Sequence, residues 1–295
     1  MDLKDELKLY MKEHEELSQS EIARSIGVSS TTISQWINNI YAGNVAKIDD
    51  KVKTFLELQK ERLSSPKGEV QFINTSNVKK GFETAKICHL DGEIGVLYGE
   101  AGCGKTTLLK EYARHYNNVI LIEADLGFTT KILFRKLHRE LGMDGLGCIH
   151  DMFEDVTARL KNSGRLIIID EAEHLPYRAL ELLRRVYDKA HVGVLLAGMP
   201  RLISNLRGKK GEYAQLYSRV GIATRLDSLK HQDTEAIVKS VLPSSNGIWK
   251  EFHEYSGGNT RILCKMLLRS RRLAQINECD VTKEIVKKTA EMLII

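Results

Sequence analysis

The sequence lacks the features that mark secreted, membrane-spanning or zinc-clustered proteins. Its 295 residues contain five cysteines but no Cys-x-x-Cys pair, which argues against a disulfide framework or a structural zinc site and indicates a reducing compartment. It has no run of about 18 apolar residues, so we expect no segment to cross a membrane. The charged N-terminal stretch lacks the apolar core of a signal peptide. We therefore expect a cytoplasmic protein.

Aromatic residues are scarce, and the charge is only mildly unbalanced. Aromatic side chains make up 6% of the chain, too few for a wide surface that stacks bases. The net charge of +5 permits a nucleic-acid partner without identifying one. Residues 1–63 carry 9 basic and 11 acidic side chains, near −2, whereas residues 200–225 carry 6 basic and 1 acidic, near +5. The positive surplus therefore lies late in the central part of the chain.

Apolar strand-like runs alternate with amphipathic helical stretches in the middle of the chain. Runs that are apolar on both faces predict a buried parallel sheet with helical crossovers, an α/β fold. The five runs are 94–98, 118–124, 165–170, 192–198 and 221–226.

Helical patterns without strands precede and follow this region. A stretch with Ser, Pro, Gly and Asn separates the first helical part from the rest, which is typical of a linker. We expect Asp280 to cap the last helix. The expected parts are a small all-α domain (1–63), a linker (64–77), an α/β core (78–226) and a helical C-terminal domain (227–295).

A glycine-rich stretch after the first strand-like run has the pattern of a phosphate-binding loop. Residues 99–107 read GEAGCGKTT, which fits G-x-x-x-x-G-K-[ST] between a predicted strand and a predicted helix. Glycines let backbone N–H groups point at phosphate oxygens, and the N-terminus of the next helix attracts the same anion. We expect Lys105 to reach the β- and γ-phosphates of ATP, and the Thr106 hydroxyl to ligate Mg²⁺. The loop residues expected at the nucleotide are Gly99, Glu100, Ala101, Gly102, Cys103, Gly104, Lys105, Thr106 and Thr107.

The third strand-like run ends in two carboxylates. RLIIID at 165–170 is followed by Glu171, and parallel sheets bind ligands at the carboxyl ends of their strands. We therefore expect Asp170 to hold Mg²⁺ and Glu171 to orient or deprotonate the attacking water. Because the pair accompanies a phosphate loop on another strand, ATP hydrolysis is favoured over an incidental helix cap.

These motifs resemble those of AAA+ ATPases over residues 78–295. The resemblance implies a P-loop NTPase with a parallel five-stranded sheet and a helical lid. It indicates Arg219 as a finger for a neighbouring subunit's γ-phosphate, with a surface arginine or a DNA contact as the alternative. It indicates Arg261, in SGGNTRIL, as a lid arginine, with an arginine that binds no ligand as the alternative. Gly198 and Met199 depart from the family, which usually has Asn, Ser or Thr there; this departure suits a slow ATPase used as a switch.

The N-terminal domain has the spacing of a helix-turn-helix. In the segment 19–39, Gly27 permits a turn between two helices, and Ser18 with Glu21 and, separately, Ser29 are candidate caps. The second helix presents polar side chains that can bond base edges or phosphates. It has no Lys or Arg, so its attraction to phosphates is weak, and a small bundle that contacts protein is the alternative. The candidate DNA contacts here are Thr31, Gln35 and Asn38.

The domain order, a helix-turn-helix ahead of a compact ATPase, narrows the resemblance from AAA+ ATPases in general to one family. With GEAGCGKTT, IIIDEAEHL, LAGMPRL, LYSRVG and SGGNTRIL, the whole chain resembles the phage Mu B transposition protein family. The resemblance implies a homo-oligomer, a helical filament or ring, that binds double-stranded target DNA non-specifically when ATP is bound. It further implies delivery of that DNA to a transposase, which it stimulates, in the cytoplasm of a bacterial host cell.

Two basic stretches are candidates for lining the path of the DNA, and either can instead be solvated surface. Two other functions stay open as alternatives. One is a nucleotide-gated transcription regulator whose helix-turn-helix reads an operator, and the other is a replication-initiator or helicase-loader ATPase. The basic residues in question are Lys131, Arg135, Lys136, Arg207, Lys209 and Lys210.

Overall fold

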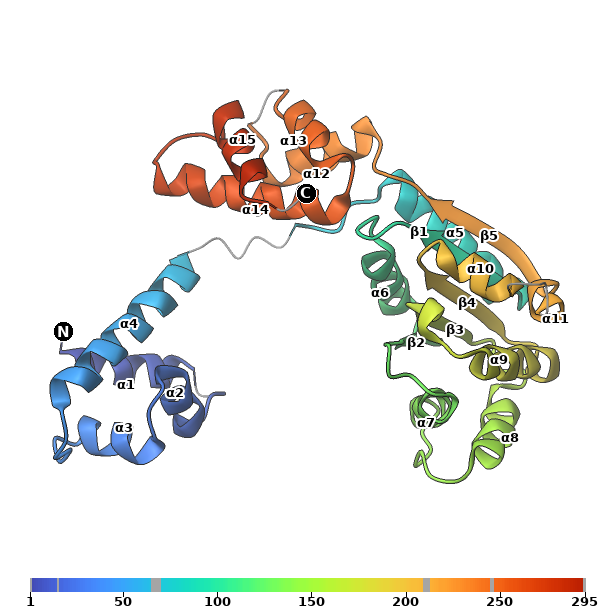
Figure 1. Cartoon of the computed structure of the whole chain (residues 1–295), viewed down its shortest axis with the longest axis horizontal. Helices are drawn as coiled ribbons and strands as arrows, with labels where there is room; N and C mark the ends of the chain where they lie inside the picture. Colours follow the sequence, from blue (N-terminus) through green and yellow to red (C-terminus); the bar gives the residue numbers. More distant parts are fainter. Residues whose placement is uncertain (1, 15, 65–69, 209–212, 245–246, 294–295) are drawn as a thin grey trace. The chain divides into compact units, whose positions relative to one another are not determined.

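The computed structural model describes residues 2–14, 16–64, 70–208, 213–244 and 247–293. It divides the chain into two compact units, Met1–Glu69 and Val70–Ile295 (Figure 1). Each unit has its own buried apolar core.

The N-terminal unit contains the predicted helix-turn-helix. Ser18 and Glu21 form a reciprocal capping box at the start of α2, and the Ser29 side chain accepts a hydrogen bond at the start of α3. Gly27 has a φ of +77°, the left-handed conformation that lets the chain turn between these helices. The helices are α1 (Leu3–Glu13), α2 (Gln19–Ile26), α3 (Ser30–Ile37) and α4 (Val45–Ser64).

Trp36 is a core residue of this unit. Its side chain is buried among apolar side chains of α2, α3 and α4, and its indole N–H donates a hydrogen bond to Asp49 Oδ1 at 2.7 Å. Because the ring is enclosed and its polar atom is paired, Trp36 offers no face on which a base could stack.

The second unit is built on the predicted parallel sheet of five strands. The strand order is β2-β3-β4-β1-β5, and every pair is parallel. α5 and α6 pack on one face of the sheet, whereas α7, α8, α9 and α10 pack on the other. The strands are β1 (Ile94–Gly99), β2 (Val119–Glu123), β3 (Leu166–Asp170), β4 (Gly193–Gly198) and β5 (Val220–Leu226).

Helices precede and connect the strands, and the sheet buries both of its faces. This arrangement explains why β1, β3 and β4 are apolar along almost their whole length. The helices are α5 (Ser76–Asp91), α6 (Lys105–His115), α7 (Thr130–Glu140), α8 (Ile149–Leu160), η1 (Ala172–His174), α9 (Tyr177–Ala190), α10 (Arg201–Arg207) and α11 (Ala214–Tyr217).

A helical subdomain follows the sheet, as predicted. Its last helix is capped by Thr282, whose hydroxyl accepts a hydrogen bond from the Ile285 N–H, so the expectation that Asp280 caps this helix was wrong. No helix in the described ranges is both long and apolar enough to cross a bilayer. The helices are α12 (His231–Val241), α13 (Trp249–Ser256), α14 (Thr260–Ile276) and α15 (Lys283–Glu291).

Residues 70–77, expected to be part of a linker, belong to the second unit. α5 already begins at Ser76, whose backbone N–H donates to Asp233 Oδ1 at 2.9 Å. Asn77 Nδ2 donates to the Asp227 carbonyl oxygen at 2.6 Å. These bonds fix the segment against the start of the helical subdomain.

Candidate nucleotide-binding site

A cavity of about 430 Å³ lies at the carboxyl ends of β1, β3 and β4. Asp170 reaches it from β3, Glu171 from directly after that strand, Gly198 from β4 and Arg261 from α14. This is the edge at which parallel α/β sheets bind ligands. The predicted loop residues that line it are Ala101, Gly102, Gly104, Lys105, Thr106 and Thr107.

The other predicted loop residues lie outside this cavity. Gly99 is buried at the end of β1, where a Cβ would come within 2.5 Å of the Leu226 carbonyl oxygen, so only glycine allows β1 and β5 to pack this closely. Glu100 is exposed to solvent. Cys103 is buried and lines a smaller, adjoining cavity.

Lys105 is folded back onto its own loop. Its Nζ donates hydrogen bonds to the carbonyl oxygens of Gly99, at 2.7 Å, and Glu100, at 3.0 Å. A third, weak contact reaches Cys103 Sγ at 3.7 Å. The ammonium group is thus held in the wall of the cavity, beside the N-terminus of α6. Both features attract an anion.

Thr106 and Asp170 meet at the cavity. Thr106 Oγ1 donates to Asp170 Oδ2 at 2.6 Å, and the Glu171 N–H donates to Asp170 Oδ1 at 3.0 Å. Asp170 is 2% exposed, and this burial raises the pKa of its carboxyl, although both hydrogen bonds act in the opposite direction.

The Thr106 hydroxyl and Asp170 carboxylate suit a magnesium ion that arrives with a nucleotide. Mg²⁺ prefers oxygen ligands, keeps several waters and takes its other ligands from substrate phosphates. Among the described residues, no group of three His, Cys, Asp or Glu side chains could hold a metal ion. The oxygens of Thr106 and Asp170 therefore fit a site in which a bound nucleotide supplies further Mg²⁺ ligands. They do not form a complete metal site by themselves.

Neutralising Asp170 should stabilise the nucleotide-free protein. A raised carboxyl pKa means that the folded state binds the proton more tightly than the unfolded state, so stability falls as pH rises through that pKa. In Asp170→Asn, the amide oxygen can accept from the Glu171 N–H and the amide N–H can bond Thr106 Oγ1. We expect the melting temperature near pH 8 to rise by about 2–4 °C, or about 1 kcal/mol for a unit of this size.

Thermal unfolding in the presence of a chelator, at about pH 4 and pH 8, checks this expectation. The stabilisation of Asp170→Asn should be larger at the higher pH, and its Mg²⁺-dependent ATP turnover should be lost. A variant that melts at or below the wild-type temperature near pH 8 would show that the carboxylate is not penalised by its burial.

Glu171 lies directly after β3 in a left-handed conformation, with φ +54°. Its half-exposed side chain lines the cavity, and its Oε2 is 3.7 Å from His174 Nε2. A carboxylate there can accept a proton from a water in the cavity. The end of β4 contributes Gly198 and Met199, so no hydroxyl or amide side chain comes from that strand end.

The start of α14 closes on the phosphate loop. The Asn259 side chain caps α14, and its Nδ2 donates to the Ala101 carbonyl oxygen at 2.9 Å. The Arg261 N–H also donates to the Gly102 carbonyl oxygen at 3.3 Å. A Cβ on Gly102 would lie 2.2 Å from Asn259 Oδ1, so this close approach requires glycine. The exposed Arg261 side chain is thereby placed at the cavity, where the sequence predicted it.

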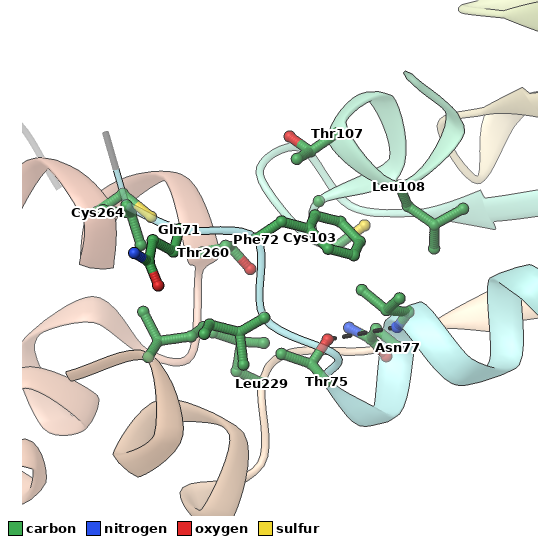
Figure 2. Close-up of a pocket in the computed structure, with 15 residues that line it drawn as sticks. Gln71, Phe72, Thr75, Asn77, Cys103, Thr107, Leu108, Leu229, Thr260 and Cys264 are labelled. Atoms are coloured by element: carbon green, nitrogen blue, oxygen red, sulfur yellow. Dashed lines mark hydrogen bonds between the residues drawn. The ribbon is translucent and has the colours of Figure 1, made fainter. Parts of the chain in front are cut away.

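A second, largely apolar cavity of about 190 Å³ adjoins the loop. Figure 2 shows side chains from the segment before α5, including Phe72, from the start of α6 and from the helical subdomain, including Leu229, facing this cavity. The two cavities meet, because four residues line both of them. The shared residues are Gly104, Thr107, Thr260 and Cys264.

Sequence reasoning missed the second cavity because residues 70–77 were assigned to a linker. The polar residues of that stretch favoured a loop, but Val70, Phe72 and Ile73 are apolar and stand directly before Thr75, which caps α5. Apolar side chains just ahead of a helix cap are a signal of packing, which the composition of the stretch concealed.

Arg219 does not line the cavity of its own chain. It precedes β5, and its Nε lies 3.2 Å from Asp188 Oδ1 on α9. Asp188 also pairs with Arg184, which in turn binds Glu181. From this position Arg219 does not contact a nucleotide in the cavity of its own chain. The position is compatible with contact to a nucleotide bound by another subunit.

The candidate DNA contacts of the second unit lie away from the cavity. On α7, Lys131 and Lys136 are exposed and Arg135 is half-buried, and Lys136 Nζ lies 4.7 Å from the centre of the Phe128 ring. The basic residues at 209–210, Lys209 and Lys210, lie outside the described residues.

Arg207 and the helix-turn-helix candidates differ in how free their side chains are. At the end of α10, Arg207 Nη2 donates to the Tyr217 hydroxyl at 2.7 Å, so part of its guanidinium is engaged. Thr31 on α3 and Asn38 directly after it are exposed, whereas Gln35 on α3 is half-buried. The structure leaves the DNA-binding role of each of these residues a prediction.

Comparison with known proteins agrees with this architecture. Residues 89–206 match the AAA domain family. The Mu-like prophage FluMu DNA transposition protein B of Haemophilus influenzae is 30% identical over 250 residues, 81% of this chain and 85% of that protein. The ATP-dependent target DNA activator B of Escherichia phage Mu is 32% identical over 229 residues, 76% of this chain and 73% of that protein. The chain belongs to the Mu B family of transposition proteins.

Solved structures with low sequence identity share the fold of this Mu B family member. The Aeropyrum pernix ORC2 protein aligns with a TM-score of 0.58 at 17% identity, over 76% of this chain and 69% of that one. The Thermotoga maritima RuvB Holliday junction branch migration motor aligns with a TM-score of 0.53 at 22% identity, over 78% and 72%. The AAA domain and these neighbours establish an AAA+ ATPase with the predicted P-loop fold.

Proposed function

We propose that the two adjoining cavities bind one molecule of ATP. The observation that carries this proposal is their shared wall at Gly104 and Thr107, where the phosphate loop becomes α6. The apolar cavity beside Phe72 suits an adenine ring, and the larger cavity beside Lys105 and the N-terminus of α6 suits a triphosphate. One elongated ligand with an apolar end and an anionic end would fill both.

Thr106 and Asp170 hold Mg²⁺ in this proposal, and the ion neutralises charge on the phosphates when it is bound. Glu171 accepts the proton of the attacking water, and Arg261 contacts the phosphates from α14. Arg219 supplies a positive charge to the nucleotide of a neighbouring subunit. Nucleotide binding thereby depends on one chain, whereas full hydrolysis depends on a homo-oligomer.

We further propose that the ATP-bound oligomer, a helical filament or ring, covers double-stranded DNA and presents it to a transposase. The name of the phage Mu relative, an ATP-dependent target DNA activator, supports the DNA part of this proposal. The charge distribution supports the second unit as the main DNA-binding part, because residues 1–63 are near −2 and residues 200–225 are near +5. Non-specific affinity for DNA comes mostly from neutralised phosphates.

The proposal predicts that the helix-turn-helix unit is not needed for ATP-dependent DNA binding. The chain truncated to residues 65–295 should still bind duplex DNA when ATP is present, because the second unit is compact in itself. Replacing Lys209 and Lys210 by alanine should flatten the dependence of log K on log salt by up to about two units per subunit, near 0.9 per lost phosphate contact. The lysine pair Lys287 and Lys288, exposed on α15, is the matched control.

DNA binding across a salt series and a footprint decide between this function and the alternatives. Continuous, ATP-dependent protection supports coverage by an oligomer, whereas one discrete protected site supports an operator-binding regulator. If the truncated chain binds ATP and stays folded but loses all ATP-dependent DNA binding, the regulator becomes the better account. Recruitment of a replicative helicase in place of a transposase would favour the helicase-loader function.

A further inference from the structure

Glu173, two residues after Glu171, is a buried carboxylate in the wall of the larger cavity. Its side chain is 3% exposed and belongs to η1, the short turn that follows β3. Among the described residues, its Oε2 has no hydrogen-bond partner. Burying a carboxylate oxygen without a hydrogen-bond donor destabilises the fold, so this unpartnered oxygen requires an explanation.

The protein holds this carboxylate in place from α10. Arg201 Nη2 lies 3.6 Å from Glu173 Oε1, and Asn205 Nδ2 donates to the Glu173 carbonyl oxygen at 3.1 Å. Arg201 Nη2 is also 3.4 Å from His174 Nε2, on the same turn. These contacts fix one carboxylate oxygen and the backbone, and they leave Oε2 as the free end.

Oε2 occupies the space that a side chain at the end of β4 would take. A Cβ added to Gly198 would lie 2.0 Å from Glu173 Oε2, so the carboxylate can occupy this position only beside a glycine. β4 lies between β3, which carries Asp170, and β1, which leads into the phosphate loop. Oε2 therefore sits between the metal-binding carboxylate and the phosphate loop, at the phosphate end of the cavity.

The chemistry of the cavity restricts the partner of Oε2. A phosphate oxygen is anionic and cannot donate, the Thr106 hydroxyl donates to Asp170, and the Lys105 ammonium donates to its own loop. The other donors that line the cavity, on Thr260, Arg261 and Lys265, make no hydrogen bond to Oε2 either. A water molecule beside the terminal phosphate is a donor that fits.

We propose that Glu173 is a second carboxylate for the attacking water, an inference that rests on ATP occupying this cavity as proposed above. Glu173 Oε2 accepts a hydrogen bond from one hydrogen of the water, and Glu171 takes the other hydrogen as a proton. The water oxygen forms the new bond to the γ-phosphorus, the bond from that phosphorus to the β–γ bridging oxygen breaks, and ADP and inorganic phosphate leave. Glu173 thus supplies, from η1, an acceptor that Gly198 and Met199 do not supply from the end of β4.

The first test compares Glu173→Gln with wild type in binding and in single-turnover hydrolysis. We expect ATP affinity, measured with a fluorescent analogue, to stay within about threefold, and the hydrolysis rate to fall about tenfold, because a neutral amide oxygen is a weaker acceptor than a carboxylate. Glu83→Gln, at an exposed glutamate on α5, is the matched control. Unchanged hydrolysis, or an equal loss of ATP binding, would overturn the role of Glu173.

A residue swap separates this role from a structural one. Gly198→Ser alone should displace the Glu173 carboxylate and slow hydrolysis, because its Cβ would meet Oε2 at 2.0 Å. In Glu173→Ala the space is free, and adding Gly198→Ser places a hydroxyl there that can hold the water. The double variant should hydrolyse ATP about tenfold faster than Glu173→Ala alone. No gain in a double variant that is folded and binds ATP would overturn the proposal, whereas failure of wild type to bind ATP would instead refute the nucleotide site itself.

Discussion

Lys105→Ala should lose ATP binding by about a hundredfold or more and, with it, all ATP-dependent binding to DNA. The ammonium is the one full positive charge of the phosphate loop, and the structure places it in the cavity wall beside the start of α6. Charge-assisted hydrogen bonds are worth about 1.5–3 kcal/mol each, so losing one or two of them accounts for an effect of this size.

The measurement is a titration of each variant with a fluorescent ATP analogue, followed by DNA binding with and without ATP. Lys110→Ala is the matched control, because Lys110 is exposed on the same helix and pairs with Glu123 at 3.8 Å. The control should bind ATP like wild type. If Lys105→Ala kept its ATP affinity, or if Lys110→Ala lost it equally, the cavity would not be the phosphate site that we propose.

The fold could be predicted from sequence because it depends on local patterns that repeat. Each strand ends within two residues of its predicted apolar run, since a strand buried on both faces leaves an uninterrupted apolar signal. The capping box of Ser18 and Glu21 and the turn at Gly27 were predicted for the same reason, because each depends on neighbours within a few residues. Asp280 failed as a cap since Thr282, two residues on, offers an equally good acceptor.

The parts of the site that sequence did not reveal depend on contacts between distant segments. The hydrogen bond from Asn259 to Ala101 joins residues 158 positions apart, and no local sequence pattern predicts it. Glu173 reads in the sequence as one more acidic residue after a strand. Its significance comes from Gly198 on another strand, whose missing side chain leaves room for the carboxylate. Charge and composition likewise gave no indication that Phe72 borders a cavity.

Arg219→Ala should bind ATP normally and lose hydrolysis by about a thousandfold, the lower end of the range for an arginine finger. The pairing with Asp188 is made through Nε, the atom of the guanidinium nearest the stem, at 3.2 Å. A carboxylate at Nε orients the planar guanidinium. The two terminal nitrogens take no part in this bond and can bind an anion on another chain. The side chain is 49% exposed, so such a partner can reach it.

Mixing Arg219→Ala with Lys105→Ala tests whether the arginine acts between subunits. Each variant alone should be inactive, but an interface that joins an intact nucleotide site from one with an intact arginine from the other should hydrolyse ATP. Random head-to-tail assembly at equal amounts makes about a quarter of the interfaces of this kind, which sets the highest turnover to expect. Arg225→Ala is the matched control, because Arg225 is also exposed and pairs through Nε, with Asp227 at 3.3 Å. Absence of recovery in mixtures that demonstrably co-assemble would mean that Arg219 acts within its own chain or only stabilises α9 through Asp188.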